Sequence, residues 1–336
     1  MAVKVALNCL RVLCIQSHVV HGYVGNKIAV FPLQVLGIEV DYINSVQFSN
    51  HTGYDFVKGQ VLDAASMKDL YLGLKANGLN KYTHVLTGYL GSPSSLEAVA
   101  DIVSDLKKEN SNIKYYCDPV LGDNGKLYVP PELVQIYQER ILPLSDVILP
   151  NQFEAEILSG IRITDEKSAL NCINYLHKKY HIPTVIITST NVTLSPVMYG
   201  YGSRLNNPMK NINNSSDLLN QRNGSVVDNT SEYDRVRFKI PHFDCHFIGT
   251  GDLFAALTLA HLETKIVNEN GQQTPKYSFK DAFQSVLGTI QTVLSKTLKI
   301  SEESLDSSKS ARIELKIIQC LDDIQNPILG DYVEEM

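Results

Sequence analysis

Short apolar segments alternate with segments of helical spacing along most of this chain. The strand-like segments lie at 11–17, 39–45, 83–89, 114–118, 147–149 and 184–187, and the helical ones at 26–36, 59–77, 93–108, 131–139 and 165–180. This alternation predicts an α/β fold with a mostly parallel central sheet and helices on both faces. In sheets of this kind, ligands bind at the carboxyl ends of the strands.

The rest of the chain is expected to extend this sheet rather than to form a second domain. Segments 196–202 and 235–240 resemble antiparallel strands, and helices are expected at 278–298 and 310–321. Between the two strands, 203–234 is rich in Asn, Ser and Asp, so we expect a flexible surface insertion there. With 336 residues, 44% of them hydrophobic, the chain can bury a substantial core. We therefore expect a single domain over residues 1–336.

Charge and cysteine content restrict the partners and the compartment. The formal net charge is −6 and no basic face is concentrated anywhere, which argues against nucleic acid and acidic membranes as partners. The apolar N-terminus is interrupted by Asn8 and Arg11 and is too short for a leader, so a cytoplasmic protein is expected. The six cysteines lack Cys-x-x-Cys spacing, which favours buried free thiols over disulfides or metal ligands.

Segment 247–257 joins a glycine-rich turn to a run of helix formers. Gly249 and Gly251 let the backbone turn tightly, so N–H groups of the first helical turn can converge on one anion, as Thr250 leads into the helix. The charge of Asp252 would repel such an anion unless the carboxylate takes part in the chemistry. It could be the general base that accepts a proton from a substrate hydroxyl as that oxygen attacks phosphorus. It could equally be only the N-cap of the helix.

Two better-known phosphate motifs are absent. The stretch from Gly122 to Leu127 has the wrong spacing for a Walker loop and no hydroxyl after Lys126, so it is expected to be a turn. The dinucleotide fingerprint fails because Gly22 to Gly25 lacks its first pair of glycines. None of the nine histidines belongs to a His-Glu-x-x-His motif, which argues against a zinc site of that kind.

Polar residues at the ends of the strand-like segments are expected to meet in one crevice with the glycine turn. They are Ser17, Tyr89, Asp118, Asn151, Glu154, Thr188 and Ser189. The amide of Asn151 and the carboxylate of Glu154 suit Mg²⁺ held mostly through water, and Asp118 and Asp123 would add carboxylates. The same residues also fit an ordinary helix start and ordinary turns, so both interpretations stay open.

Several dispersed blocks carry a resemblance. The turn at 249–252 resembles the anion-hole and base motif of the ribokinase-like superfamily, and Asn151-x-x-Glu154 resembles its magnesium-associated motif. The blocks 17–19, 22–26, 32–37, 44–53, 86–89, 118–123 and 150–156 are similar, nearly letter for letter, to the pyridoxal kinase family. The resemblance runs from about Arg11 to Leu298, the insertion excepted.

The resemblance implies ATP-dependent phosphorylation of the 5′-hydroxymethyl group of pyridoxal, pyridoxine and pyridoxamine by a homodimer. It assigns the pyridine ring to Ser17, Val24, Phe48, Thr52 and Tyr89. It makes Asp252 the base and the amides of Gly249, Thr250 and Gly251 the anion hole. It surrounds the triphosphate with Asp118, Asn151, Glu154, Thr188, Ser189 and Thr250, and the Mg²⁺ with Asp118, Asp123 and Glu154.

Two departures and two alternatives accompany the resemblance. Leu149 stands where the family often has threonine, which removes a hydroxyl near a K⁺ or Na⁺ site beside Asp123 and predicts weaker activation by monovalent cations. The loop after Asp123 is also shorter than in animal relatives. The alternative enzyme is a related kinase for a hydroxymethylpyrimidine or a sugar alcohol. The alternative from another class is a non-catalytic carrier of pyridoxal phosphate, against which an intact Asp252 argues.

Overall fold

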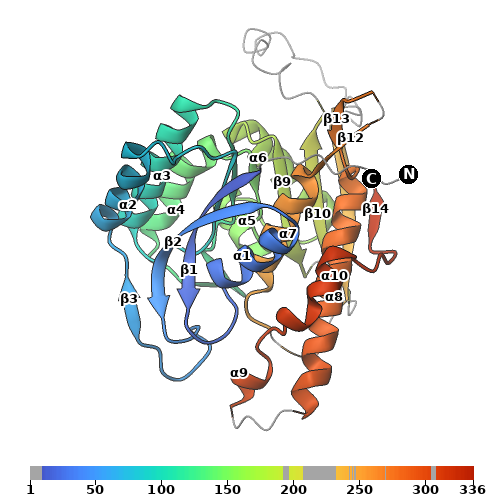
Figure 1. Cartoon of the computed structure of the whole chain (residues 1–336). Coiled ribbons are helices and arrows are strands. Elements are labelled where there is room, and N and C mark those ends of the chain that lie inside the picture. Colours follow the sequence, from blue (N-terminus) through green and yellow to red (C-terminus); the bar gives the residue numbers. More distant parts are fainter. Residues whose placement is uncertain are drawn as a thin grey trace.

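A ten-stranded sheet organises the molecule, in the order β14-β11-β10-β9-β8-β5-β4-β1-β2-β3 (Figure 1). The computed structural model describes residues 10–191, 197–206, 232–241, 243, 245, 247–268, 270–303 and 308–336. The strands of the sheet are β1 (Arg11–Val19), β2 (Glu39–Phe48), β3 (Gly59–Val61), β4 (His84–Thr87), β5 (Lys114–Cys117), β8 (Val147–Ile148), β9 (Thr184–Thr190), β10 (Val197–Leu205), β11 (Tyr233–Pro241) and β14 (Val333–Glu335).

The centre of the sheet is parallel, and the antiparallel strands predicted at 196–202 and 235–240 are present as β10 and β11, whereas the antiparallel edge strands β3 and β14 were not predicted. Strands β2, β1, β4, β5, β8 and β9 pair in parallel, whereas β3, β10, β11 and β14 pair antiparallel with their neighbours. The chain passes from β1 to β2 on one side and returns to β4 on the other. A switch point therefore lies between β1 and β4, which is where open α/β sheets bind ligands.

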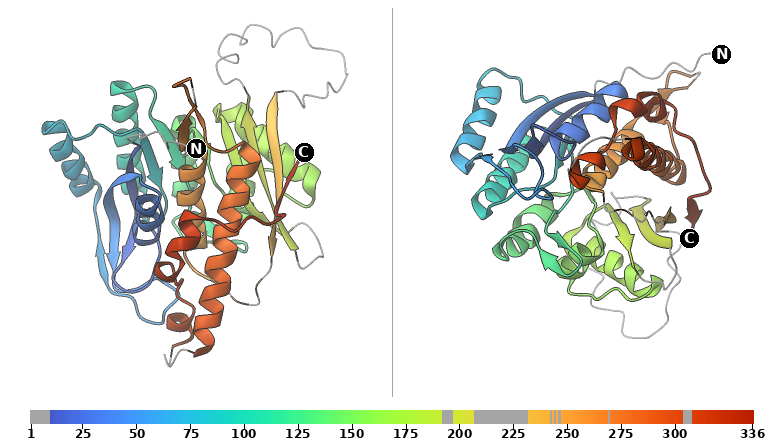
Figure 2. Two further views of the ribbon diagram at one scale, coloured as in Figure 1. Left: turned by 45° about the vertical axis from the view of Figure 1, so that its right-hand side comes forward. Right: turned by 90° about the horizontal axis from the view of Figure 1, so that it is seen from below.

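Helices cover both faces of the sheet (Figure 2). One face carries α2 (Ala64–Ala76), α3 (Pro93–Glu109), α4 (Glu132–Ile136), α5 (Gln152–Ser159) and α6 (Glu166–Tyr180); the other carries α1 (Asn26–Val35), α7 (Thr250–Glu263), α8 (Phe279–Glu303) and α10 (Leu321–Gln325). Side chains of β1 alternate between the two cores, with Leu13 and Ile15 in one and Val12 and Cys14 in the other. This alternation is the period of a strand buried on both faces.

The predicted α/β fold class is confirmed, but several element boundaries were wrong. Segment 59–77 does not start as a helix, because Gly59 begins β3 and α2 starts only at Ala64, after the N-cap Asp63. Strand β2 runs on to Phe48, which pairs with Gly59, so the predicted loop at 46–53 begins as strand. The predicted turn at 122–127 is a tight hairpin between β6 (Gly122–Asp123) and β7 (Lys126–Leu127).

The C-terminal helix predicted at 310–321 is also wrong. Instead α9 (Lys309–Arg312) ends early, and a non-helical stretch precedes a short 3₁₀ turn, η4 (Ile318–Cys320), and α10. Leu315 and Ile317, which lie in this non-helical stretch, are fully buried.

The ends of the predicted insertion at 203–234 belong to strands. Residues 203–205 continue β10 and residues 233–234 begin β11, because the two strands pair over their whole length. Residues 207–231 lie outside the described part of the chain. The described cysteines are free, and Cys14, Cys117, Cys172 and Cys320 are buried, as predicted. Among the described helices, none is both long and apolar enough for a membrane span.

Candidate active site

The turn that starts α7 has the geometry expected of an anion site. Gly249 is the N-cap, with φ +89°, and a Cβ there would lie 2.3 Å from the carbonyl oxygen of Tyr23, so only glycine fits. No side chain caps this helix. Its first N–H groups are therefore available to an anion, with the positive end of the helix dipole behind them.

Asp252 is not the N-cap of α7. It is the third helical residue after Gly249, and its Oδ2 accepts a hydrogen bond of 2.8 Å from the backbone N–H of Gly25, in a different loop. Gly25 has φ +55°, and a Cβ there would lie 2.1 Å from the carbonyl oxygen of Ser17. Burial raises the pKa of Asp252 to about 6, against the lowering effect of the Gly25 N–H. The capping interpretation of Asp252 was wrong.

Asp118 lies beside the same turn. Its Oδ2 is 3.8 Å from the position that a Cβ on Gly251 would take, and the side chain is buried. Burial, together with the negative charges of Glu154 and Asp252, raises the pKa of Asp118 well above its usual range. A carboxyl group whose ionisation two neighbouring carboxylates disfavour fits the neighbourhood of a cation.

Glu154 and Asn151 have a structural role that accounts for both residues. They form a capping box at the start of α5, in which Glu154 Oε2 accepts from the Asn151 N–H at 2.9 Å. Glu154 Oε1 accepts from the N–H of Leu121 at 2.9 Å, and Asn151 Nδ2 donates to the Gly122 carbonyl at 2.8 Å. The ordinary helix start that the sequence left open is therefore present. Burial raises the pKa of Glu154 to about 7.

The predicted metal ligands do not form a ready-made cage. Asp123 Oδ1 accepts from the Asn124 N–H at 2.7 Å, and both oxygens of Glu154 already accept hydrogen bonds. Within the described residues, no group of three or more His, Cys, Asp or Glu side chains is arranged to hold a metal ion. A metal here would need oxygens from phosphate and water, which is the usual way in which Mg²⁺ is held.

A cavity of about 560 Å³ opens beside the glycine turn. Five site residues predicted from the sequence line it on the side of the glycine turn, namely Asp123, Thr188, Ser189, Thr250 and Gly251. Its other wall is largely apolar and was missed by the sequence analysis: Met198, Ile240, Phe243, Cys245, Phe247, Phe254, Leu287, Ile290 and Leu294. In the sequence these residues look like ordinary core. A pocket with one polar and one apolar side suits a nucleotide.

The predicted ring-binding residues lie around the loops that follow β1, β2 and β4. Ser17 is buried and adjoins Gly25, and Val24 is 3.4 Å from the position of a Cβ on Gly249. Phe48 ends β2, and Thr52 is exposed in the loop beyond it. The carbonyl of Tyr89 accepts a hydrogen bond of 2.9 Å from Ser45 Oγ. The first two therefore lie next to Asp252 and its turn.

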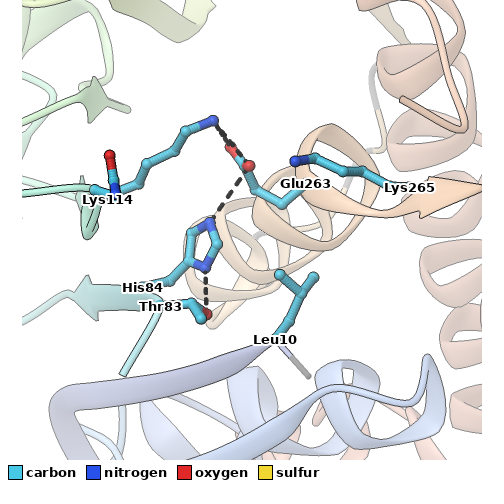
Figure 3. A pocket seen from close by; sticks show the side chains of 7 residues that line it. Leu10, Thr83, His84, Lys114, Glu263 and Lys265 are labelled. Carbon is cyan, nitrogen blue, oxygen red and sulfur yellow. Dashed lines mark hydrogen bonds and ion pairs between the residues drawn. The ribbon is translucent and has the colours of Figure 1, made fainter. Parts of the chain in front are cut away.

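A second pocket, of about 250 Å³, lies at the opposite end of the sheet (Figure 3). Its central residue is Glu263, at the C-terminal end of α7. Lys114 Nζ donates to both oxygens of Glu263, at 2.8 and 2.9 Å, and the hydroxyl of Tyr116 donates at 2.6 Å. His84 Nε2 lies 3.4 Å from Oε2. The charge of Glu263 is thus matched by groups of the protein itself.

The sheet order, the uncapped start of α7 and the acid beside it define a class of protein, the ribokinase-like phosphotransferases. A family model described as phosphomethylpyrimidine kinase matches residues 80–270. Pyridoxal kinase from Ovis aries is 43% identical, over 94% of this chain and 96% of the relative, and that from Homo sapiens is 42% identical over the same shares. The chain belongs to the pyridoxal kinase family.

Solved structures agree with this placement. Pyridoxal kinase from Leishmania donovani, in complex with ADP and pyridoxamine, is 31% identical and superposes with a TM-score of 0.80. The match covers 97% of this chain and 99% of that one. The ribokinase-like fold and the family expected from the sequence are both confirmed.

Proposed function

We propose that this protein transfers the γ-phosphoryl group of ATP to the 5′-hydroxymethyl group of pyridoxal, pyridoxine and pyridoxamine. The observation that carries the proposal is Asp252, held by the Gly25 N–H beside an uncapped helix start. Pyridoxal kinases similar over nearly the whole chain support the choice of acceptor.

Each group of the site has a role in this reaction. The hydroxymethyl oxygen approaches Asp252, which accepts its proton as the bond to phosphorus forms and the bond to the leaving ADP oxygen breaks. The N–H groups of Gly249, Thr250 and Gly251 donate to the equatorial oxygens of the transferring phosphoryl. Because the alcohol loses its proton late in a loose transition state, a carboxylate of ordinary basicity suffices.

The nucleotide would occupy the 560 Å³ cavity. Thr188, Ser189 and Thr250 would contact the phosphates, and the apolar wall from β10, β11 and α8 suits the base. Asp118, together with Asp123, Asn151 and Glu154 through water, would hold Mg²⁺, which neutralises the phosphate charge when bound. In the described site Glu154 and Asn151 position the loop at 121–123 through the hydrogen bonds given above.

The ring of the acceptor would lie among Ser17, Val24, Phe48, Thr52 and Tyr89. The hydroxyls of Ser17 and Thr52 suit the ring nitrogen and the 3-oxygen. We further propose a homodimer in the cytoplasm, a single domain over residues 1–336, and weak activation by K⁺ or Na⁺ near Asp123.

The test is phosphate transfer from Mg-ATP to pyridoxal by the purified protein, followed through the absorbance of pyridoxal phosphate. A hydroxymethylpyrimidine serves as the competing acceptor, because the matched family model carries that description. Turnover of pyridoxal is the expected result. Turnover of the pyrimidine alone would replace the proposal with the alternative kinase, and binding of pyridoxal without turnover would replace it with a carrier.

A further inference from the structure

Glu314 is a buried carboxylate that connects a late part of the chain with two early loops. It lies between α9 and η4 and is 7% exposed. The first loop, residues 20–25, follows β1, and the second, residues 49–54, follows β2. Figure 1 shows α9 at the lower edge of the molecule, where the arrowheads of β1 and β2 also point. This is the edge that carries the proposed acceptor site.

Both oxygens of Glu314 bind these loops. Oε2 accepts a hydrogen bond of 3.2 Å from the backbone N–H of Tyr23. Oε1 accepts one of 3.0 Å from the hydroxyl of Tyr54 and lies 3.0 Å from Nε2 of His51. The Ser310 hydroxyl adds a hydrogen bond of 3.1 Å to the Gly53 carbonyl. We call Glu314, His51, Tyr54 and the Tyr23 N–H the Glu314 clamp.

The local sequence leaves room for this carboxylate. Gly22 has φ +90°, and a Cβ on it would lie 2.3 Å from Glu314 Oε1. A side chain at position 22 would therefore displace the clamp as well as strain the turn. Burial alone would raise the pKa of Glu314, but the hydrogen bonds and charge of its partners outweigh this and lower it. Glu314 is thus an ionised carboxylate whose two oxygens both accept hydrogen bonds.

Each loop held by the clamp also contacts the reacting end of the site. The N–H of Tyr23 is two residues from that of Gly25, which binds Asp252 at 2.8 Å. His51 precedes Thr52, and a Cβ on Gly53 would lie 2.5 Å from Cδ1 of Ile248, just before the anion-binding turn. A shift of either loop would therefore move the acceptor site relative to the base.

We propose that Glu314 is a positioning residue that fixes the two acceptor-binding loops against Asp252. The inference rests on the proposed function for the identity of the acceptor. Since Glu314 touches neither the nucleotide cavity nor the turn itself in the described contacts, its effect falls on the acceptor side of the reaction. It adds to the site a residue that no phosphate-binding motif contains.

The test compares Glu314→Gln with Glu263→Gln, a matched change of another buried, histidine-paired carboxylate at the far end of the sheet. Glu314→Gln is expected to raise KM for pyridoxal by about tenfold or more, as misplacement of a bound substrate does, with KM for ATP unchanged. Glu263→Gln is expected to lower Tm and leave both KM values alone. Tyr54→Phe keeps the carboxylate and is expected to raise KM for pyridoxal by about threefold.

Calorimetric binding of pyridoxal separates this inference from the proposed function. A wild-type protein that binds pyridoxal without turnover would defeat the proposed function, and the affinities of the variants would still decide the clamp. Equal changes in both KM values, or a normal KM and affinity for pyridoxal in Glu314→Gln and Tyr54→Phe, would overturn the positioning role. If Glu314→Gln does not fold, Tyr54→Phe and His51→Gln carry the same comparison.

Discussion

Helix α7 carries a carboxylate near each end, and the two are surrounded in opposite ways. Glu263, at the C-terminal end, is bound by Lys114 and Tyr116 and lies beside His84. Asp252, near the N-terminal end, receives one backbone N–H and no cation among the described residues. The helix dipole alone would favour the acid at the N-terminal end. Partner groups, rather than position on the helix, decide how each acid behaves.

The pKa values reflect this difference. Burial alone would raise the pKa of Glu263, but the hydrogen bonds and charges of His84 and Lys114 outweigh it and lower the pKa to about 2. Burial raises the pKa of Asp252 to about 6. An acid stabilised by built-in cations is a structural element. A buried acid without such cations lowers the stability of the fold and can accept a proton near neutral pH. Acids with raised pKa values of this kind are common at catalytic sites.

The sharpest test of the contrast is removal of Asp252. Asp252→Ala is expected to bind ATP and pyridoxal but to turn over at least roughly a hundredfold more slowly, because the general base is lost. Steady-state kinetics and calorimetric binding measure the two parts. Near-normal turnover would remove Asp252 from the chemistry. The isosteric Asp252→Asn is expected to be equally slow and more stable than the wild type, since it no longer buries an ionisable acid.

The corresponding change at the other end of α7 is Glu263→Gln. It weakens the hydrogen bonds that half-exposed Lys114 and buried Tyr116 donate, and their loss is expected to cost roughly 1–3 kcal/mol of unfolding free energy. Turnover by the folded protein should stay normal, because Glu263 lies at the far end of α7 from the crevice. Urea unfolding and kinetics on the same sample check both statements. A slow but fully stable variant would contradict the structural role of Glu263.

Sequence reasoning pointed to the glycine turn and to part of the polar side of the cavity, but to little of the far end of the sheet. The glycine turn at 249–252 could be recognised because its chemistry needs adjacent residues. The roles of Glu314 and Glu263 could not be recognised, because their hydrogen-bond partners lie far away in the sequence and on other elements. The apolar cavity wall, with Phe254 and Leu287, has the same composition as core. Only the folded arrangement shows which apolar residues face a cavity.

Local boundaries failed where tertiary pairing overrode local pattern. Gly59 to Val61 has no strong strand signal and becomes β3 only because β2 offers an open edge. The predicted helix at 310–321 is interrupted between α9 and η4, where Leu315 and Ile317 enter the core formed by α7 and α8. Both errors concern segments whose structure depends on a distant neighbour.

The two acids should also give opposite pH dependence. The folded pKa of Glu263 lies below its ordinary value of 4.5, so its contribution to stability is present above pH 4.5 and is lost as pH falls toward about 2. The folded pKa of Asp252 lies above its ordinary value of 3.8, so stability falls as pH rises from about 4 to 6. Each effect is no more than roughly 3 kcal/mol.

Unfolding curves of the wild type, Glu263→Gln and Asp252→Asn between pH 2 and 8 measure these contributions. In Glu263→Gln, the free energy of unfolding should no longer rise as the pH increases from about 2 to 4.5. In Asp252→Asn, it should no longer fall as the pH increases from about 4 to 6. In the wild type, kcat/KM for pyridoxal should increase through pH about 6 as Asp252 loses its proton. A pH–rate profile that is flat from pH 5 to 7 would show that this proton is not part of the rate.

The smallest expected effect is the response of turnover to a monovalent cation, K⁺ or Na⁺, bound near Asp123. Leu149 is 2% exposed and packs in the apolar core with Leu253 and Ile186, so its side chain offers no oxygen to a monovalent ion beside Asp123. Replacing potassium by tetramethylammonium should therefore change wild-type turnover by no more than about twofold, or about 0.4 kcal/mol of barrier. Leu149→Thr should increase the potassium response and lower Tm, since it buries a hydroxyl in that core. Strong potassium activation of the wild type would instead assign the ion to backbone carbonyls. The crevice would then acquire from solution the kind of positive partner that Lys114 supplies permanently to Glu263.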